Sequence, residues 1–325
     1  MKLTNLALCI TLGSTALTTP VFAQDITLRV SHNANADEPY GVGMRKMAEL
    51  LEEKTDGAAT IQVFDNATLG DEMESIQGTQ IGTVDIAVTS SSTLANFVPD
   101  LSVFSLPFLF ESAEQMDRAL SSPEVIAAIN SALDEQGFHL LSVFSAGTRH
   151  IMTKTPVESL ADLNGMKIRT MQDPAHVDTF NAFGANATPT AYTELYGALE
   201  TGVVDGAEAA NTNFYSQKFY EVAPDWAVVG WLELVAPVIM GKAAYEALPE
   251  DIQTALDEAG LEAGIAERKA YLESDNARFA DLEKVGVNVT HPDTAEFREA
   301  AAPVQEKYLE TEKKREIFDL VKSVE

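Results

Sequence analysis

The sequence predicts an α/β protein with two lobes, a ligand cleft between them and a long helix that spans both. Short β-rich segments alternate with helical ones, which is typical of βαβ units around largely parallel sheets. Residues 242–284 are almost continuously helical in composition, with Pro249 at the start of a new helix. Because no repeat, low-complexity tract or Gly/Ser linker divides the sequence, we expect the chain to cross between the lobes several times.

The first half of the chain contains a series of expected elements bounded by turn residues. Apolar residues recur near helical spacing over 39–54, and Asp37 is available as a cap just before that helix. Ser90, Ser91 and Ser92 follow a buried strand, and small polar residues at the carboxyl end of a strand often line a crevice. We expect strands over 26–31, 59–64, 84–88 and 138–143, and helices over 39–54, 71–81, 112–120 and 123–136.

The second half continues the alternation of strands and helices. A turn at 163–165 introduces a strand, and residues 226–241 are apolar enough to form either a buried strand or an interface. We expect strands over 149–153 and 166–171, and helices over 174–183 and 193–201.

Residues 1–23 have the pattern of a cleaved secretory signal. Lys2 precedes an apolar stretch, and Ala23 supplies a small residue at the cleavage point. The alternative is a membrane anchor, but the apolar run is interrupted by Pro20 and falls short of the roughly 20 residues that a span needs. Because Cys9 is the single cysteine and lies in this segment, we expect the mature chain to lack disulfides, catalytic thiolates and cysteine-ligated metals.

The charge of the chain limits its partners. Lys and Arg number 22 against 50 Asp and Glu, which gives a formal net charge of −28 at pH 7. Such an excess repels nucleic acid and anionic membrane surfaces at long range. We therefore expect no nucleic-acid partner and an exported protein that does not itself span a membrane, while an anionic ligand would need local cations.

No sequence motif indicates catalysis or metal binding. The five histidines fall in no ligand spacing such as H-E-x-x-H, and the chain has neither a nucleophile elbow nor a phosphate loop. With fifty acidic residues, some carboxylates will lie close together whatever the function, so their proximity is weak support for acid/base chemistry. We expect no catalytic residue, no metal and no cofactor.

Two arginines are candidates for an anion site. Arg149 and Arg169 both stand at expected strand positions close to turn residues. A strand holds such a side chain firmly, and a guanidinium group matches a carboxylate in a bidentate geometry. The alternative for each arginine is a structural ion pair with one of the many acidic residues.

Six short motifs follow one another in order along the mature chain. They are GDE at 70–72, LPFLF at 106–110, GTR at 147–149, DLNGMKIR at 162–169, LETGVVDGAE at 199–208 and KFYEV at 218–222. Together they resemble the DctP-type solute-binding proteins of TRAP transporters. The resemblance runs over nearly the whole mature chain, and the ordered series is far more specific than any one motif.

The resemblance implies a periplasmic receptor with the two-lobed periplasmic binding protein fold. Such a receptor closes on a small organic acid, either a sugar acid or a dicarboxylate, and delivers it to the membrane permease of a TRAP transporter. It catalyses no reaction. By this resemblance residues 24–147 form mainly the first lobe and 148–235 mainly the second, while 236–325 hold crossing segments and long C-terminal helices that contribute to both.

The resemblance also implies which residues contact the ligand. Arg169 matches the arginine that pairs with the ligand carboxylate, and Arg149 is similar to a second carboxylate contact. Tyr192 matches an aromatic position that packs on the ligand, with ordinary core packing as the alternative. Asn33 and Ser90 resemble positions from which the first lobe reaches the ligand, although both residue types are also common in turns and caps.

The sequence departs from the family pattern at several positions. Several acidic-sugar binders carry Asn directly after the D-G-x-E element, whereas Ala209 stands here and Asn211 and Asn213 follow slightly later as candidate ligand contacts. Trp231 replaces a residue that is often polar in other members, and it either stacks on a sugar ring or packs in a buried interface. Glu233 either faces the cleft and accepts hydroxyl groups or lies on the surface.

Two other functions remain open at the level of sequence. A periplasmic lyase or hydrolase acting on acidic sugars would need a titratable pair in the cleft. An exported structural or protein-binding protein would show no stabilisation by a small molecule. The ligand itself is open among uronates, aldonates, dicarboxylates and zwitterions such as ectoine.

Overall fold

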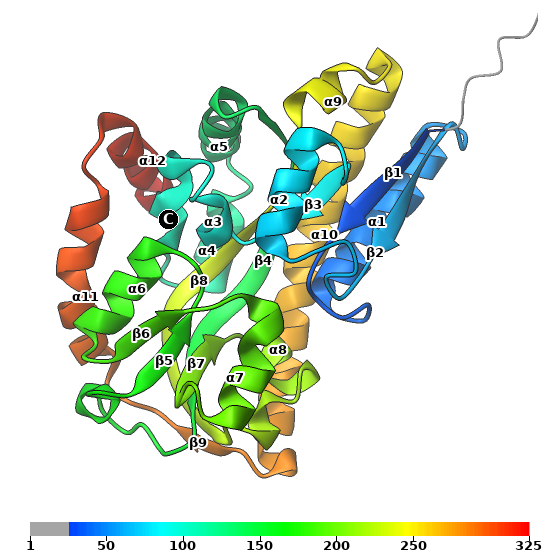
Figure 1. Ribbon diagram of the computed structural model, residues 1–325. Helices are drawn as coiled ribbons and strands as arrows, with labels where there is room; N and C mark the ends of the chain where they lie inside the picture. The colour runs from blue at the N-terminus through cyan, green and yellow to red at the C-terminus, as the bar shows by residue number, and fades with distance from the viewer. Residues whose placement is uncertain (1–25, 325) are drawn as a thin grey trace, which may run out of the picture.

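One mixed β-sheet runs through the computed structural model, which describes residues 26–324 (Figure 1). The predicted signal at 1–23 lies outside the described residues. Eight of the nine strands within 26–324 follow the order β2-β1-β3-β8-β4-β7-β5-β6, and β9 pairs with β8. The strands are β1 Ile26–Ser31, β2 Ala59–Phe64, β3 Ile86–Val88, β4 Phe138–Thr153, β5 Lys167–Thr170, β6 Asn186–Pro189, β7 Gly206–Ala209, β8 Asp225–Gly241 and β9 Asn288–Thr290.

The described residues also form twelve α-helices, of which α10 is the longest and packs against both α1 and α8 (Figure 1). Within 26–324 no helix combines the length and the apolar character that a bilayer crossing requires. The helices are α1 Pro39–Lys54, α2 Glu72–Ile81, α3 Ser91–Leu94, α4 Ala113–Ala119, α5 Pro123–Glu135, α6 Pro174–Ala182, α7 Leu195–Thr201, α8 Asn211–Ser216, α9 Lys242–Glu246, α10 Glu250–Leu282, α11 Thr294–Tyr308 and α12 Glu312–Ser323.

Two long antiparallel strands, β4 and β8, join the two halves of the sheet. They pair from Phe138 opposite Gly241 to Thr153 opposite Asp225. β3 pairs with β8 and extends the sheet through β1 to β2, while β7, β5 and β6 extend it beyond β4. The fold therefore has two lobes that are linked by continuous strands and by α10, as the sequence predicts.

The bounds expected for β1, α1 and β2 are confirmed, but three other expectations are wrong. The strands expected at 138–143 and 149–153 are one strand, because the intervening residues keep pairing with β8 through bulges. The sheet is mixed rather than largely parallel, since β8 runs antiparallel to both β3 and β4. Asp37 does not cap α1; Glu38 is its N-cap residue, and the Glu38 side chain makes no capping hydrogen bond.

A bulge in β4 determines where Arg149 lies. The register between β4 and β8 shifts just before and just after Arg149. Gly147 has a φ of 76° in this bulge, and a Cβ atom there would collide with Tyr271 and Ala210. Glycine is required at this position because no other residue allows both the positive φ and the close approach. The G-T-R motif thus fixes the backbone that carries Arg149.

The hydrophobic core connects the halves of the sheet. Its largest cluster of buried apolar residues extends from Met44 on α1 to Phe180 on α6. A second cluster lies among α3, α4, α5 and α12, and a third lies around α7, α8 and β9. Buried polar residues such as Arg149, Arg169 and Glu208 therefore lie among large clusters of apolar side chains.

Candidate ligand-binding site

A cavity lies between the two halves of the molecule and encloses about 510 Å³ of empty space, including its mouth. One wall is formed by the segment between β1 and α1, the first residues of α1 and α2, and the N-cap residue of α3; the other wall is formed mainly by β4, β5 and α8. The cavity is lined by six of the eight residues that the sequence predicts as ligand contacts: Asn33, Ser90, Arg149, Arg169, Tyr192 and Asn213.

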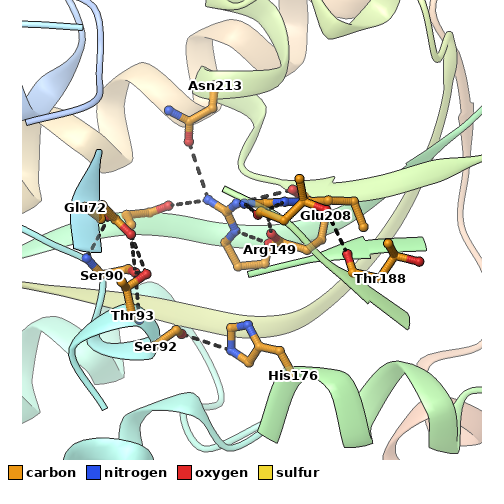
Figure 2. A network of polar contacts seen from close by, with 12 residues as sticks. Glu72, Ser90, Ser92, Thr93, Arg149, His176, Thr188, Glu208 and Asn213 are labelled. Atoms are coloured by element: carbon orange, nitrogen blue, oxygen red, sulfur yellow. Dashed lines mark hydrogen bonds and ion pairs between the residues drawn. The ribbon is translucent and has the colours of Figure 1, made fainter. Parts of the chain in front are cut away.

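Two buried arginines share one buried carboxylate at the base of this cavity. Arg149 Nε donates to Glu208 Oε2 at 2.7 Å, and Arg169 Nη1 donates to Glu208 Oε1 at 3.2 Å. Figure 2 shows the Glu208 and Arg149 side chains side by side. Arg149 also donates to the carbonyl of Ala146, and Arg169 donates twice to the carbonyl of Thr190. The cluster carries two positive charges and one negative charge, so it has a net charge of +1.

The pKa shifts of the two arginines agree with their distances to Glu208, since Arg149 makes the shorter bond. Burial raises the pKa of Glu208, but Arg149 and Arg169 lower it more, so the pKa lies below its usual value. Burial lowers the pKa of Arg169, and Glu208 compensates only in part. For Arg149 the nearer Glu208 outweighs the effect of burial and raises the pKa. Arg169 is therefore the less compensated cation.

Tyr192 provides a hydroxyl group without a protein partner. Its ring meets Phe219 edge to face, with ring centroids 6.0 Å apart. The Tyr192 hydroxyl is buried and has no hydrogen-bond partner among the described residues. Because a buried hydroxyl without a partner is costly, this group is available to a ligand in the cavity that Tyr192 lines.

Ser90 lines the cavity and also caps a helix. Its hydroxyl accepts a hydrogen bond from the backbone N–H of Thr93 at the start of α3. Ser90 donates to Glu72 from both its backbone N–H and its hydroxyl, at 3.0 Å each, and Thr93 donates to the same carboxylate at 2.5 Å (Figure 2). Ser90 can therefore cap α3 and still lie at the cavity, so the two roles that the sequence indicates for it are compatible. Glu72 places a carboxylate in the cavity wall.

Asn213 lines the cavity, but its amide is largely engaged with protein groups. Its Nδ2 donates to Glu38 Oε2 at 2.6 Å, and its Oδ1 accepts from the hydroxyl of Tyr271 at 2.8 Å. A longer bond of 3.5 Å joins this Oδ1 to Arg149 Nη1. Asn213 therefore connects the arginine cluster to both walls of the cavity.

Asn211 and Trp231 lie away from the cavity, which corrects their expected placement. Asn211 accepts a hydrogen bond from Trp226 Nε1 and donates to Asp275, so both ends of its amide are engaged. Trp231 is fully buried in the core and packs edge to face against His176 and Phe180. Of the two alternatives for Trp231, the structure therefore shows packing in a buried interface.

Glu233 lies neither on the surface nor in the cavity lining. It is buried, and both carboxylate oxygens accept from the hydroxyl of Thr148 at 2.9 Å. Burial raises its pKa to about 8. Neither alternative that the sequence allows for Glu233 is therefore correct.

The sequence assigns no role to three acidic residues at this site: Glu38 and Glu72 line the cavity, and Glu208 is buried against the two arginines. Glu72 and Glu208 both stand inside motifs of the family series, so their position in those motifs could have identified them. Glu38 belongs to no motif, and nothing in its sequence surroundings indicates a cavity residue. In the described residues no group of three or more His, Cys, Asp or Glu side chains could hold a metal ion.

Comparisons with known proteins agree with this geometry. Residues 30–312 match the bacterial extracellular solute-binding protein family 7. A solute-binding protein of Roseobacter denitrificans is 34% identical over 285 residues, which cover 86% of each chain. A TRAP periplasmic solute-binding protein from R. denitrificans, solved with bound β-D-glucuronate, superposes with a TM-score of 0.87 at 31% identity and covers 92% of this chain and 100% of that one.

A third comparison gives the same result. The TRAP periplasmic solute-binding protein from Sulfitobacter sp., solved with bound β-D-galacturonate, has a TM-score of 0.85 at 32% identity and covers 92% of this chain and 99% of that one. The chain belongs to the bacterial extracellular solute-binding proteins of family 7, the DctP family. It is a substrate-binding protein of the TRAP type and not an enzyme.

Proposed function

We propose that the cavity binds a sugar acid with a single carboxylate and that the protein delivers this ligand to the membrane permease of a TRAP transporter. The arginine cluster supports the choice of one carboxylate. Its net charge of +1 becomes zero when one carboxylate binds, and uncompensated charge in a buried site is costly. Arg169, the less compensated cation, is the main partner of that carboxylate in this proposal, with Arg149 in support.

The rest of the cavity wall supports a ligand that carries hydroxyl groups. Glu72 offers carboxylate oxygens that accept hydrogen bonds from hydroxyl groups, and the negative charges of Glu38 and Glu72 repel a second carboxylate. The free hydroxyl of Tyr192 can donate to a ring or chain oxygen. The two solved relatives carry glucuronate and galacturonate, each of which has one carboxylate and several hydroxyl groups.

Three ligands that differ by one carboxylate at a time test this proposal. The three ligands have a similar carbon chain: D-galactose has no carboxylate, D-galacturonate has one and D-galactarate has two. Isothermal titration calorimetry measures the affinity for each. We expect galacturonate to bind at least about a hundredfold more tightly than either of the others, because a lost or surplus buried charge costs about 3 kcal/mol or more. Glucuronate and galactonate would then distinguish a uronate from an aldonate.

Two results would contradict this assignment. Tighter binding of galactarate than of galacturonate would indicate a dicarboxylate site. Equal affinities for galactose and galacturonate would show that the arginines do not bind the ligand carboxylate.

We also propose that the protein is exported and works in the periplasm with the division into lobes that the sequence suggests. The division at 24–147, 148–235 and 236–325 is supported by the way in which β4 and β8 join the two halves of the sheet. Residues 1–23 have the pattern of a signal. N-terminal sequencing of the exported protein should begin at Gln24; a sequence beginning at Met1 would contradict export by cleavage.

A further inference from the structure

Glu38 is a buried carboxylate that forms no ion pair with any residue the structure describes. It is 3% exposed, lies at the start of α1 and lines the cavity. Within residues 26–324 the groups that hydrogen-bond to it are all neutral. Its side chain does not cap its own helix. The local structure of α1 therefore does not explain why a carboxylate is buried here.

Three side chains of one distant segment surround the Glu38 carboxylate. Asn213 donates to Oε2 at 2.6 Å, while Ser216 and Gln217 each donate to Oε1 at 2.8 Å. The backbone N–H of Asn35 adds a longer bond of 3.3 Å. Burial raises the pKa of Glu38 above its usual value, and these bonds offset that rise only in part. Because every neighbour can donate, the arrangement suits the ionised carboxylate, which can only accept.

The donors of Glu38 belong to the opposite wall of the cavity. Asn213 and Ser216 lie on α8, and Gln217 is its C-cap residue. The α8 helix is fixed to α10 and β8, because Thr212 donates its backbone N–H to Asp275 at 2.8 Å and Trp226 donates to Asn211 at 3.0 Å. The bonds from α8 to Glu38 therefore join the β1–α1 segment to a helix that is held by the other half of the molecule.

A second contact joins the walls on the other side of the arginines. Ser92 at the start of α3 hydrogen-bonds to His176 on α6 at 3.1 Å. Figure 2 shows Asn213 and the Ser92–His176 pair on opposite sides of Arg149. The Ser92–His176 contact is a single neutral bond, whereas the Glu38 contact has three donors on one charged acceptor. Hydrogen bonds to charged groups are the stronger kind.

We propose that Glu38 and its donors on α8 form a latch that holds the cavity closed around any ligand. In this role Glu38 is a positioning residue that acts through the population of the closed form. A change that reduces this population lowers the apparent affinity for each ligand by the same factor. A residue that contacts the ligand changes the affinities for different ligands unequally. The inference rests on the proposed function, because it assumes that the cavity closes on a small acid.

The double variant Ser216→Ala/Gln217→Ala tests the latch without changing the cavity wall, which neither residue lines. We expect calorimetry to show that glucuronate and galacturonate both bind about tenfold or more weakly, and by the same factor, since two hydrogen bonds to a charged acceptor are lost. Ser131→Ala/Gln136→Ala makes the same chemical changes at two exposed positions on and next to α5 and should leave both affinities unchanged. Unchanged affinities in the latch variant, or losses that differ more than about threefold between the ligands, would overturn the proposal.

A second measurement follows closure without any ligand. Dyes attached through Lys46→Cys on α1 and Glu200→Cys on α7 report the separation of the two halves by energy transfer, because residues 24–325 contain no cysteine. We expect the latch variant to have a smaller closed fraction than the otherwise unchanged labelled protein. Identical distributions would overturn the latch. A wild-type protein that binds no sugar acid would instead contradict the proposed function, so the two failures are distinguishable.

Discussion

At the scale of single residues, Arg149 and Arg169 are not equivalent although both lie at the ligand cavity. Arg149 makes the shorter bond to Glu208, at 2.7 Å against 3.2 Å for Arg169. Removing Arg149 would leave the buried Glu208 without its nearer cation. Removing Arg169 would leave the Arg149–Glu208 pair intact. The two arginines should therefore contribute differently to stability and to ligand binding.

The variant Arg169→Ala should lose ligand affinity and largely keep its stability. We expect a loss of about 3–5 kcal/mol in the free energy of binding, or at least about a hundredfold in Kd, because the ligand carboxylate loses its main cation. Calorimetry with galacturonate measures this loss, and thermal unfolding measures stability. Arg149→Ala is the comparison, and it should unfold at a clearly lower temperature. An unchanged Kd in Arg169→Ala would reject the role of this residue.

Glu233 should make the protein less stable as the pH rises. Burial raises its pKa to about 8, above the 4.5 that is usual for a glutamate. The unfolded chain therefore loses this proton before the folded protein does, and stability falls between about pH 4.5 and pH 8. Glu233→Gln removes this effect and keeps an acceptor for Thr148. We expect Glu233→Gln to be more stable by about 3 kcal/mol at pH 7 and unchanged near pH 4.

Urea unfolding of wild type and Glu233→Gln at both pH values measures this difference. Glu221→Gln is a control, because it makes the same change at an exposed position whose carboxylate also accepts a hydrogen bond from a hydroxyl group, that of Tyr196. A stability difference that stays constant from pH 4 to pH 8 would show that Glu233 does not titrate as inferred.

At the scale of elements, α10 lies unusually close to β4. Gly260 and Gly264 both face this strand, and a Cβ atom at 260 would overlap the carbonyl group of Leu141. At 264 the nearest obstacle is the hydroxyl of Ser142. Glycine costs a helix about 1 kcal/mol relative to alanine, so its presence here is explained by packing rather than by helix formation.

The substitution Gly260→Ala should destabilise the protein despite the better helix propensity of alanine. We expect a loss of about 1–3 kcal/mol in the free energy of unfolding, because the added methyl group forces backbone shifts where α10 meets β4. Gly197→Ala on α7 is the matched control, since a Cβ there meets nothing within 4 Å. It should stabilise the protein by up to about 1 kcal/mol. Equal effects of both substitutions in denaturant unfolding would contradict this explanation of Gly260.

At the scale of the whole molecule, the net charge of −28 opposes the capture of an anion. The arginine cluster has the opposite sign, but it is buried and acts only at short range. Dissolved salt screens charges that are separated by more than about 10 Å at 0.1 M, and it screens buried pairs much less. Long-range repulsion and short-range attraction should therefore respond differently to ionic strength.

Added salt should accelerate the binding of galacturonate. Between about 10 mM and 200 mM sodium chloride we expect the association rate constant to rise about twofold to tenfold, because the surface charge that repels the ligand is screened. Stopped-flow fluorescence measures this rate constant, and the dissociation rate constant serves as the internal control that should change less. An association rate constant that falls or stays level with added salt would contradict the role of the net charge.

Much of the architecture follows from local sequence patterns. Apolar spacing determined the bounds of β1, α1 and β2, and it indicated the start of a new helix at Pro249, just before α10. The ordered motifs identified the family and placed Arg149 and Arg169 at the ligand cavity. These predictions succeed because helical and strand periodicity depend on neighbours in sequence, and because each motif is a short continuous segment.

The tertiary structure alone decided which distant residues meet. The sequence does not indicate that Glu208 lies between two arginines or that Glu38 meets Ser216, which follows it by 178 residues. It left open whether Trp231 stacks on a ligand or packs in a buried interface, and only the structure decided this. The antiparallel course of β4 and β8 was likewise not apparent from the composition of either strand. Such contacts depend on how the two halves of the sheet fold together. Buried charges and amides need hydrogen-bond partners, and these partners come from distant segments that the local sequence does not identify.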